Sequence, residues 1–188
     1  MRVYIPATLA MLRGLVDTGE LTAVNGTAFA LTPALRESYT SGTTEELEYA
    51  ALTEAARGSL RLLASHTPGA VGEEAGVMPR HPDPAEGAPA GEKDPPRRVV
   101  VSADLDEVTL RPDLDHAVVR LAGPVALADV AAVHVDTPEA ESAVLAAAPV
   151  IDEADLGDEE AELALGDVED HELAWYAPQE LPFLLELM

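Results

Sequence analysis

A Pro- and Gly-rich segment from 67 to 96 is the feature that most restricts what this chain folds into. It contains seven Pro, five Gly and no aromatic residue, so it buries too little apolar surface to offset the entropy of ordering it. We therefore expect a flexible internal linker outside the packed body. At 188 residues the chain has the length of one domain, and we expect a single domain, 1–188, interrupted by this linker.

Strand and helix patterns alternate on both sides of the linker, and this order predicts the fold class. The capping box from Thr43 to Glu46 opens the best-marked helix. The order predicts an α+β fold with a mixed β-sheet covered by helices, and a ferredoxin-like topology is one arrangement compatible with it. The patterns predict strands at 2–6, 27–31, 98–104, 116–122, 131–135 and 173–177, and helices at 9–18, 33–39, 43–65, 138–148 and 180–187.

Negative charge is concentrated toward the end of the chain. The formal net charge is −24, and residues 151–188 contribute −13 of it because they hold 13 acids and no Lys or Arg. We interpret 151–172 as an acidic, partly irregular connector, in which 159–165 has some helical character, followed by a strand and a helix over 173–188. Such a field repels phosphate backbones and anionic lipids, so we expect no direct nucleic-acid or membrane partner. A basic protein is the partner that this charge would suit.

Signatures of known chemistry are missing from the sequence. No Cys is present, which excludes disulfides, iron–sulfur clusters and thiol nucleophiles. The phosphate-binding patterns G-x-G-x-x-G and G-x-x-x-x-G-K-[ST] and the serine-nucleophile pattern G-x-S-x-G do not occur. We therefore predict no cofactor and no metal centre, and we assign no catalytic residue. Arg13 and Asp17 interrupt the first apolar run, so no signal peptide is indicated and we expect a cytoplasmic location.

Polar residues at predicted strand ends give the sharpest candidate for a polar site. His134 and Asp136 are two residues apart and so share one face of a strand, and His116 belongs to another strand that would lie alongside. Two metal ligands do not define a coordination geometry when no third ligand is present. The favoured interpretation is that these three are ordinary residues at strand ends and on the surface. The alternative is a small enzyme with an unrecognised site at the strand ends, to which Asp104 would contribute.

Aromatic residues gather near the C-terminal end. Three of the seven in the chain fall within 175–183. Trp175 and Tyr176, with the neighbouring Gln179 and Glu180, form a candidate interaction surface. The competing interpretation, which the usual burial of such residues favours, is that Trp175 and Phe183 anchor the last strand and helix on the core.

The segments MRVYIPATLAMLRGLVDTGEL, EELEYAALTEAA, RRVVVSAD, AAVHVD and DHELAWYAPQELPFLLEL together resemble an actinobacterial family of uncharacterised proteins, classed as a domain of unknown function. The resemblance covers nearly the whole chain outside the linker. It implies a cytoplasmic protein of high-GC bacteria. It implies no activity, cofactor or catalytic residue.

The function that these observations favour is a non-catalytic cytoplasmic protein-interaction or regulatory module. Two alternatives stay open. One is the small enzyme described above. The other is an acidic nucleic-acid mimic that binds a basic protein, which requires its carboxylates to lie on an ordered surface. The sequence indicates no oligomeric state.

Overall fold

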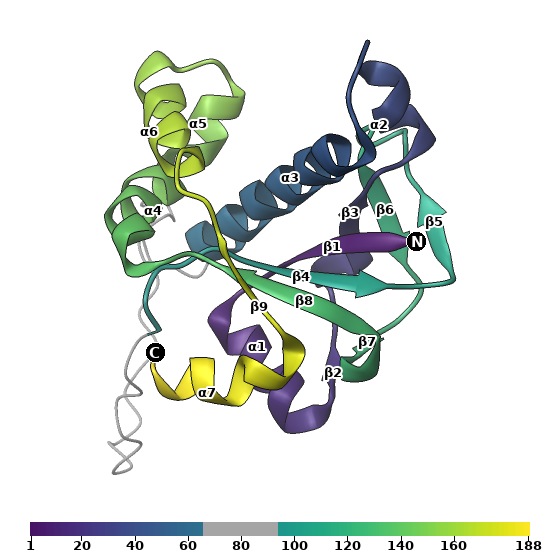
Figure 1. The fold of residues 1–188 in the computed structure, drawn as a ribbon. Coiled ribbons are helices and arrows are strands. Elements are labelled where there is room, and N and C mark those ends of the chain that lie inside the picture. The colour runs from purple at the N-terminus through teal and green to yellow at the C-terminus, as the bar shows by residue number, and fades with distance from the viewer. Residues whose placement is uncertain (66–93) are drawn as a thin grey trace, which may run out of the picture.

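A computed structural model describes residues 1–65 and 94–188. It has helices on both faces of a seven-stranded sheet with the order β5-β6-β3-β1-β4-β8-β9 (Figure 1). The expected linker 67–96 lies outside the described residues except for its last three. The strands of this sheet are β1 (Arg2–Ala7), β3 (Thr27–Ala30), β4 (Val99–Asp104), β5 (Val108–Leu110), β6 (Val118–Leu121), β8 (Val130–Val135) and β9 (Ala174–Tyr176), and β2 (Glu20–Leu21) pairs with β7 (Val125–Ala126). The helices are α1 (Leu9–Thr18), α2 (Pro33–Ser38), α3 (Thr44–Ser65), α4 (Glu141–Ala147), α5 (Ile151–Asp155), α6 (Glu159–Glu169) and α7 (Leu181–Glu186).

The sheet confirms the expected α+β class, with two differences in its topology. Every ladder of the seven-stranded sheet is antiparallel, so the sheet is antiparallel rather than mixed. β3 and β4 flank β1 and both run opposite to it, so β3, α3 and β4 form a split β-α-β unit. β1 lies inside this unit, as the first strand does in the ferredoxin-like fold, but the strand that follows α1, β2, pairs with β7 outside this sheet, and β6 takes the place beside β3.

One face of the sheet is closed by α1 and α7. Thr8 caps α1 by accepting a hydrogen bond from the Met11 N–H, and Gly19 ends it in the left-handed conformation with φ +80°. Both helices turn a stripe of leucines toward the valines of β1, β4 and β8. This aliphatic layer is the main core. The buried leucines are Leu9, Leu12 and Leu15 in α1 and Leu181, Leu184 and Leu185 in α7.

The other face is crossed by α3, which contacts β1, β3 and β4. A Cβ atom at Gly58 would lie 2.7 Å from Cγ of Pro6, so a glycine is needed where the helix backbone meets β1. The hydroxyl of the buried Ser59 donates to the Ala7 carbonyl oxygen at 2.7 Å and accepts from the Val99 N–H at 2.8 Å. These contacts fix α3 over the ends of two adjacent strands.

The acidic stretch 151–172 forms the helices α5 and α6, where the sequence indicated a partly irregular connector. Ile151 and Val168 are buried in a cluster with Leu60 of α3. Asp158 caps α6 by accepting from the Ala161 N–H at 3.0 Å. Several acids lie in the first turns of the two helices, where the helix dipole favours negative charge, so the charge does not prevent helix formation.

A buried ion pair joins the two halves of the fold. The side chains of Arg98 and Asp136 are 4% and 0% exposed. Asp136 accepts hydrogen bonds from the backbone N–H, Nε and Nη2 of Arg98, each at 2.8 Å. Nη2 of Arg98 also donates to the carbonyl oxygen of His171 at 2.8 Å. The pair therefore ties the start of β4 to the end of β8 and to the connection between α6 and β9.

Replacing Asp136 with Ala leaves the guanidinium of Arg98 buried without a counter-charge. We expect Asp136→Ala to lower the free energy of unfolding by about 3–5 kcal/mol, measured by urea denaturation. Asp113→Ala is the matched control, because it removes the carboxylate of the exposed Arg111–Asp113 pair and should leave the midpoint nearly unchanged. Equal midpoints for the two variants would contradict this role of the buried pair.

Gly58 and Gly166 provide a comparison of two helical glycines in different surroundings. A Cβ at position 58 meets Pro6, whereas a Cβ at position 166 has no neighbour within 4 Å. Gly58→Ala should therefore destabilise the fold by about 1–3 kcal/mol through overpacking. Gly166→Ala should stabilise it by about 0.5–1 kcal/mol, because alanine is the better helix former. Thermal unfolding of both variants measures the difference, and a gain in stability at position 58 would show that α3 does not pack this tightly on β1.

Candidate functional site

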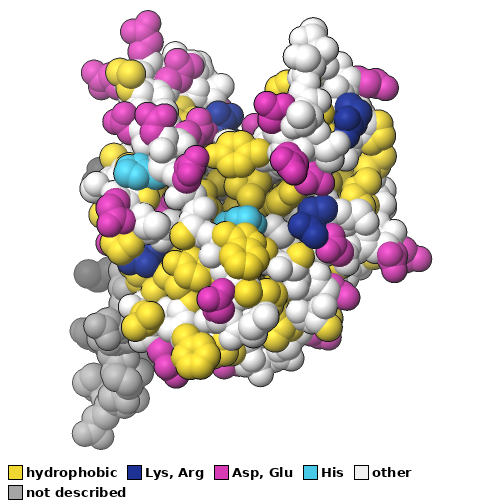
Figure 2. All heavy atoms as spheres, viewed as in Figure 1, with side chains coloured by type: hydrophobic (Ala, Val, Ile, Leu, Met, Phe, Trp, Pro, Cys, Tyr) yellow, Lys and Arg dark blue, Asp and Glu magenta, His cyan; other side chains and the backbone are white. Residues whose placement is uncertain are grey.

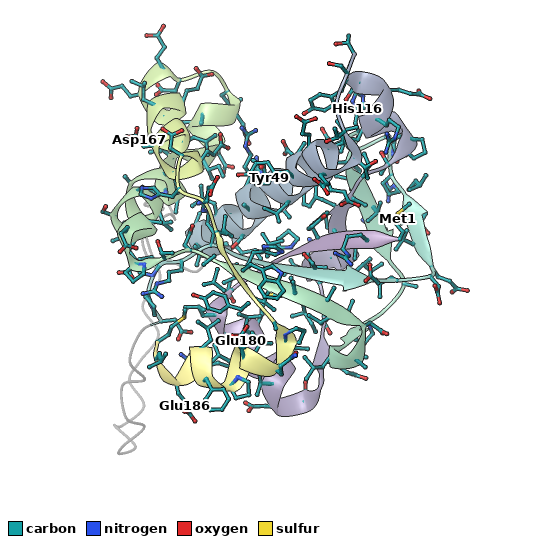
Figure 3. The ribbon with its side chains drawn as sticks, in the orientation of Figure 1. Met1, Tyr49, His116, Asp167, Glu180 and Glu186 are labelled. Atoms are coloured by element: carbon teal, nitrogen blue, oxygen red, sulfur yellow. The ribbon has the colours of Figure 1, made fainter. Side chains whose placement is uncertain are left out.

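Part of the sheet face crossed by α3 is open over β8 and β9, whereas Ser102 of β4 and Tyr4 of β1 on the same face are 1% and 6% exposed. Tyr4 lies directly opposite Ser102, and His134 lies directly opposite Trp175, so these four side chains form a row on one face across four neighbouring strands. We call this row the open sheet face. Figure 2 shows hydrophobic side chains and a histidine at the centre of this side of the molecule with Asp and Glu around them, and Figure 3 places Tyr49 of α3 at its upper border.

Ser102 and His134 form a hydrogen bond at the centre of the open sheet face. Oγ of Ser102 lies 2.9 Å from Nε2 of His134. Burial, together with the nearby charge of Arg2, lowers the pKa of His134 to about 4, so the ring is neutral near pH 7. Ser102 is 1% exposed and so is not accessible as a nucleophile. Among residues 1–65 and 94–188 no buried side-chain nitrogen or oxygen lacks a hydrogen-bond partner, so the second ring nitrogen of His134, which has no hydrogen bond there, reaches solvent.

Charged groups gather at the β1 end of the open sheet face. Nε and Nη2 of Arg2 donate to the two carboxylate oxygens of Asp104 at 2.7 and 2.8 Å, and this bond lowers the pKa of Asp104. Burial, together with the carboxylate of Glu48 in α3, raises the pKa of Tyr4 to about 12. Glu48 is partly buried and forms no ion pair or side-chain hydrogen bond within the described chain. It is therefore a carboxylate beside Tyr4 that has no ion-pair partner, although its charge also acts on Arg2.

The C-terminal aromatics are less buried than the favoured interpretation expected. Trp175 is 61% exposed and Phe183 is 71% exposed, so neither side chain is an anchor in the core. Tyr176 points to the opposite face of β9 and packs against the main core. Glu180 is exposed, and its carboxylate accepts the backbone N–H three residues before it at 2.7 Å; Gln179 beside it is exposed as well. Of the four residues of the predicted interaction surface, Trp175 alone lies on the open sheet face.

The structure does not bring the candidate polar cluster together. β6, which follows His116, and β8, which holds His134, are four strand steps apart, or about 19 Å. Figure 3 shows His116 near α2, away from the centre of the sheet. Asp136 is held in the buried pair with Arg98. In the part of the chain that the structure describes, no group of three or more His, Asp or Glu is arranged to hold a metal ion.

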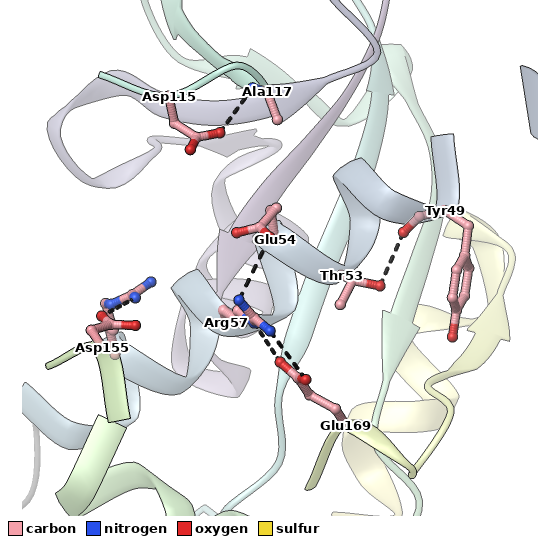
Figure 4. Close-up of polar contacts among 9 residues, drawn as sticks. Tyr49, Thr53, Glu54, Arg57, Asp115, Ala117, Asp155 and Glu169 are labelled. Atoms are coloured by element: carbon pink, nitrogen blue, oxygen red, sulfur yellow. Dashed lines mark hydrogen bonds and ion pairs between the residues drawn. The ribbon is translucent and has the colours of Figure 1, made fainter. Parts of the chain in front are cut away.

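A second polar group joins α3 to α5 and α6 (Figure 4). Arg57 forms an ion pair with Glu169 and a longer one, at 3.7 Å, with Glu54. Arg61 pairs with Asp155 at 2.5 Å. Burial raises the pKa of Glu54, and Arg57 opposes this effect. The two arginines neutralise Glu169 and Asp155 across the contact between the helices, so we interpret this group as structural.

A cavity of about 530 Å³ lies between the start of α1, the end of α3 and α4. Its polar side chains are Thr8 and Asp94. Thr8 caps α1, and Asp94 is paired with Arg13 at 2.7 Å. The polar groups of this cavity are therefore engaged within the protein, and the open sheet face is the stronger candidate site.

Sequence reasoning did not nominate Tyr4, Ser102 or Glu48. A signal for Ser102 existed: in the strand at 98–104 a serine alternates with the buried valines and so shares a face with Val100. Glu48 had no such signal, because it is one of several acids at the start of a helix.

The fold and site together define an α+β protein with an antiparallel sheet that leaves part of one face open. Residues 1–185 match the profile of DUF6912, a family of unknown function, and the chain belongs to this family. This match to the family does not show the actinobacterial origin that the sequence resemblance implied. No curated protein and no solved structure matches the chain. Within the described residues, no helix is both long and apolar enough to cross a membrane.

The lowered pKa of His134 makes stability depend on pH. Free histidine titrates near 6.5, and His134 in the folded protein titrates near 4, so between these values the unfolded chain binds a proton that the folded protein does not. The neutral ring's contribution is therefore fully present above pH 6.5 and decreases as the pH falls toward 4. We expect His134→Asn to reduce this loss of stability, measured by urea unfolding at pH 7.5, 6.0 and 4.5. An NMR titration of the wild-type ring with a midpoint near 6.5 would contradict the expectation.

Proposed function

We propose that this protein is a cytoplasmic, non-catalytic interaction module that binds a basic segment of another protein on the open sheet face. The observation that carries the proposal is the exposure of Trp175, whose side chain is 61% exposed on the part of the sheet face that α3 leaves open. Exposed aromatic rings beside polar rims are typical of protein-binding surfaces, because the ring contributes a large contact area at little cost in side-chain entropy.

The charge distribution supports a basic partner. Seven of the nine arginines in the described residues are already held in ion pairs. The chain as a whole carries −24, and acids surround the open sheet face in Figure 2. A field of this sign increases the association rate of a cationic segment and disfavours an anionic one.

The two other functions have less support. An enzyme at the strand ends would need His116 near His134, and the sheet order separates them by about 19 Å. A nucleic-acid mimic would bind its basic partner through the ordered acids of α5 and α6. That surface is different from the open sheet face, so substitutions distinguish the two modes of binding.

Isothermal titration with a tryptophan-free, arginine-rich dodecapeptide in 150 mM salt tests the proposal. We expect Trp175→Ala to weaken binding about tenfold, because the loss of an aromatic hot spot costs on the order of 1–2 kcal/mol. Phe183→Ala, which removes the other exposed C-terminal aromatic, should leave the affinity within about twofold of wild type.

A result in which Trp175→Ala binds as wild type would overturn the proposal. If binding instead falls when Glu159 and Glu160 of α6 are both changed to Gln, with no effect of Trp175→Ala, the mimic is the correct function.

A further inference from the structure

The row of side chains on the open sheet face points to a partner of defined shape. Resting on the proposed function, we infer that the basic segment binds as an extended peptide across the strands, with an apolar side chain on Trp175 and a single Lys or Arg beside Glu48. The peptide would pass over His134 and Ser102 between these two contacts.

The distance between the two ends of the row sets the length of the peptide. Trp175 lies on β9 and Tyr4, which is next to Glu48, lies on β1. β9 and β1 are three strand steps apart, or about 14 Å across the strands, and the row shifts by two residues along the strands between Ser102 and His134, so its ends are about 16 Å apart. An extended chain advances about 3.3–3.6 Å per residue, so this span corresponds to between four and five residues. Side chains alternate between the two sides of an extended chain, so a spacing of four residues is the one that turns both end side chains toward the sheet.

The charges at the β1 end determine what binds there. Both carboxylate oxygens of Asp104 already accept from Arg2, so this pair is neutral. Glu48 is not paired within the described residues, although its charge affects both Tyr4 and Arg2. Glu48 is therefore a partly buried carboxylate without an ion-pair partner among the described residues, and in this position a cation beside it is more stabilising than on an exposed surface.

The middle of the row is polar but uncharged. His134 is neutral near pH 7 because its pKa is about 4, and its second ring nitrogen faces solvent. The hydroxyl of Tyr4 has no hydrogen bond in the described part of the protein, and no unpartnered polar side-chain atom is buried there, so it too reaches solvent. Uncharged hydrogen-bonding groups suit the amides of a peptide backbone better than a second cation.

The β9 end has a different chemistry, because Trp175 presents a broad apolar ring whose cross-strand neighbour, His134, is uncharged. A leucine-sized or aromatic side chain gains most there from removing the indole from water. The peptide that fits therefore has an apolar residue at position i and a basic residue at position i+4.

Two octapeptides of identical composition test the spacing. Ac-GSLSGSRG-NH2 places Arg four residues after Leu, and Ac-GSLRSGSG-NH2 places it next to Leu. Trp175 is the single tryptophan of the chain, so its intrinsic fluorescence reports directly on occupancy of the β9 end. We expect the first peptide to bind about five- to tenfold more tightly than the second.

Glu48→Gln should remove this preference by weakening binding of the first peptide about five- to tenfold without changing binding of the second. Glu45→Gln is the control, since Glu45 is an exposed acid in the first turn of the same helix, and it should leave both affinities unchanged. Circular dichroism of both variants shows whether the fold is retained.

Equal affinities of the two peptides for the wild-type protein would overturn the inference, and so would an unchanged preference in a folded Glu48→Gln variant. If either result occurs while binding of the arginine-rich dodecapeptide still depends on Trp175, the inference fails and the proposed function stands. If that binding does not depend on Trp175, the proposed function fails.

Discussion

The buried pair of Arg98 and Asp136 is the interaction on which the position of the candidate site depends. Removing two charges from water costs several kcal/mol per ion in a protein interior, and close geometry with full hydrogen bonding is needed to offset that cost. Here the carboxylate accepts three hydrogen bonds from Arg98, and the guanidinium donates a further one to the carbonyl of His171. That last bond holds the chain just before β9. It thereby fixes where Trp175 enters the sheet.

The close approach of α3 to β1 decides how much of the sheet remains open. Gly58 lets the helix backbone meet Pro6, and Ser59 bridges the end of β1 and the start of β4. Farther along, Leu60 packs into the cluster shared with α4, α5 and α6. With α3 held at both places, its length covers β1, β3 and β4 but does not extend over β8 and β9. The open sheet face is thus a consequence of packing elsewhere in the fold.

Local patterns in the sequence were sufficient to predict most of the central elements. The strand expected at 98–104 corresponds to β4, the one at 131–135 corresponds to β8, and the helix expected at 43–65 corresponds to α3. These elements have continuous apolar runs or a clear cap, so short-range preference and tertiary packing agree. The acidic helices were under-predicted because their few buried residues, such as Ile151 and Val168, are widely spaced among carboxylates.

The sequence did not predict which strands pair with one another in the sheet, and the candidate site depends on that pairing. The strands that follow His116 and contain His134 look equivalent in the sequence, yet three other strands separate them in the sheet. The same pairing places Ser102 against His134, which no spacing along the chain indicates. Sequence reasoning identified Trp175 as a candidate because it is an unusual residue in this composition. It did not identify Glu48 among 35 acids, because this residue differs from the other described acids only in being partly buried without an ion-pair partner, which is a three-dimensional property.

The arrangement of the open sheet face also gives it a direction. Its β1 end combines a neutral Arg2–Asp104 pair with the unpaired Glu48, and its β9 end presents an uncharged indole. A segment bound in reverse would place its cation over Trp175, where the ring offers a cation–π contact but no neutralising carboxylate. It would also leave Glu48 partly buried beneath an apolar side chain, which costs more than leaving it in water. The unpaired carboxylate therefore disfavours the reversed orientation as well as attracting a basic residue, and selectivity arises from both effects.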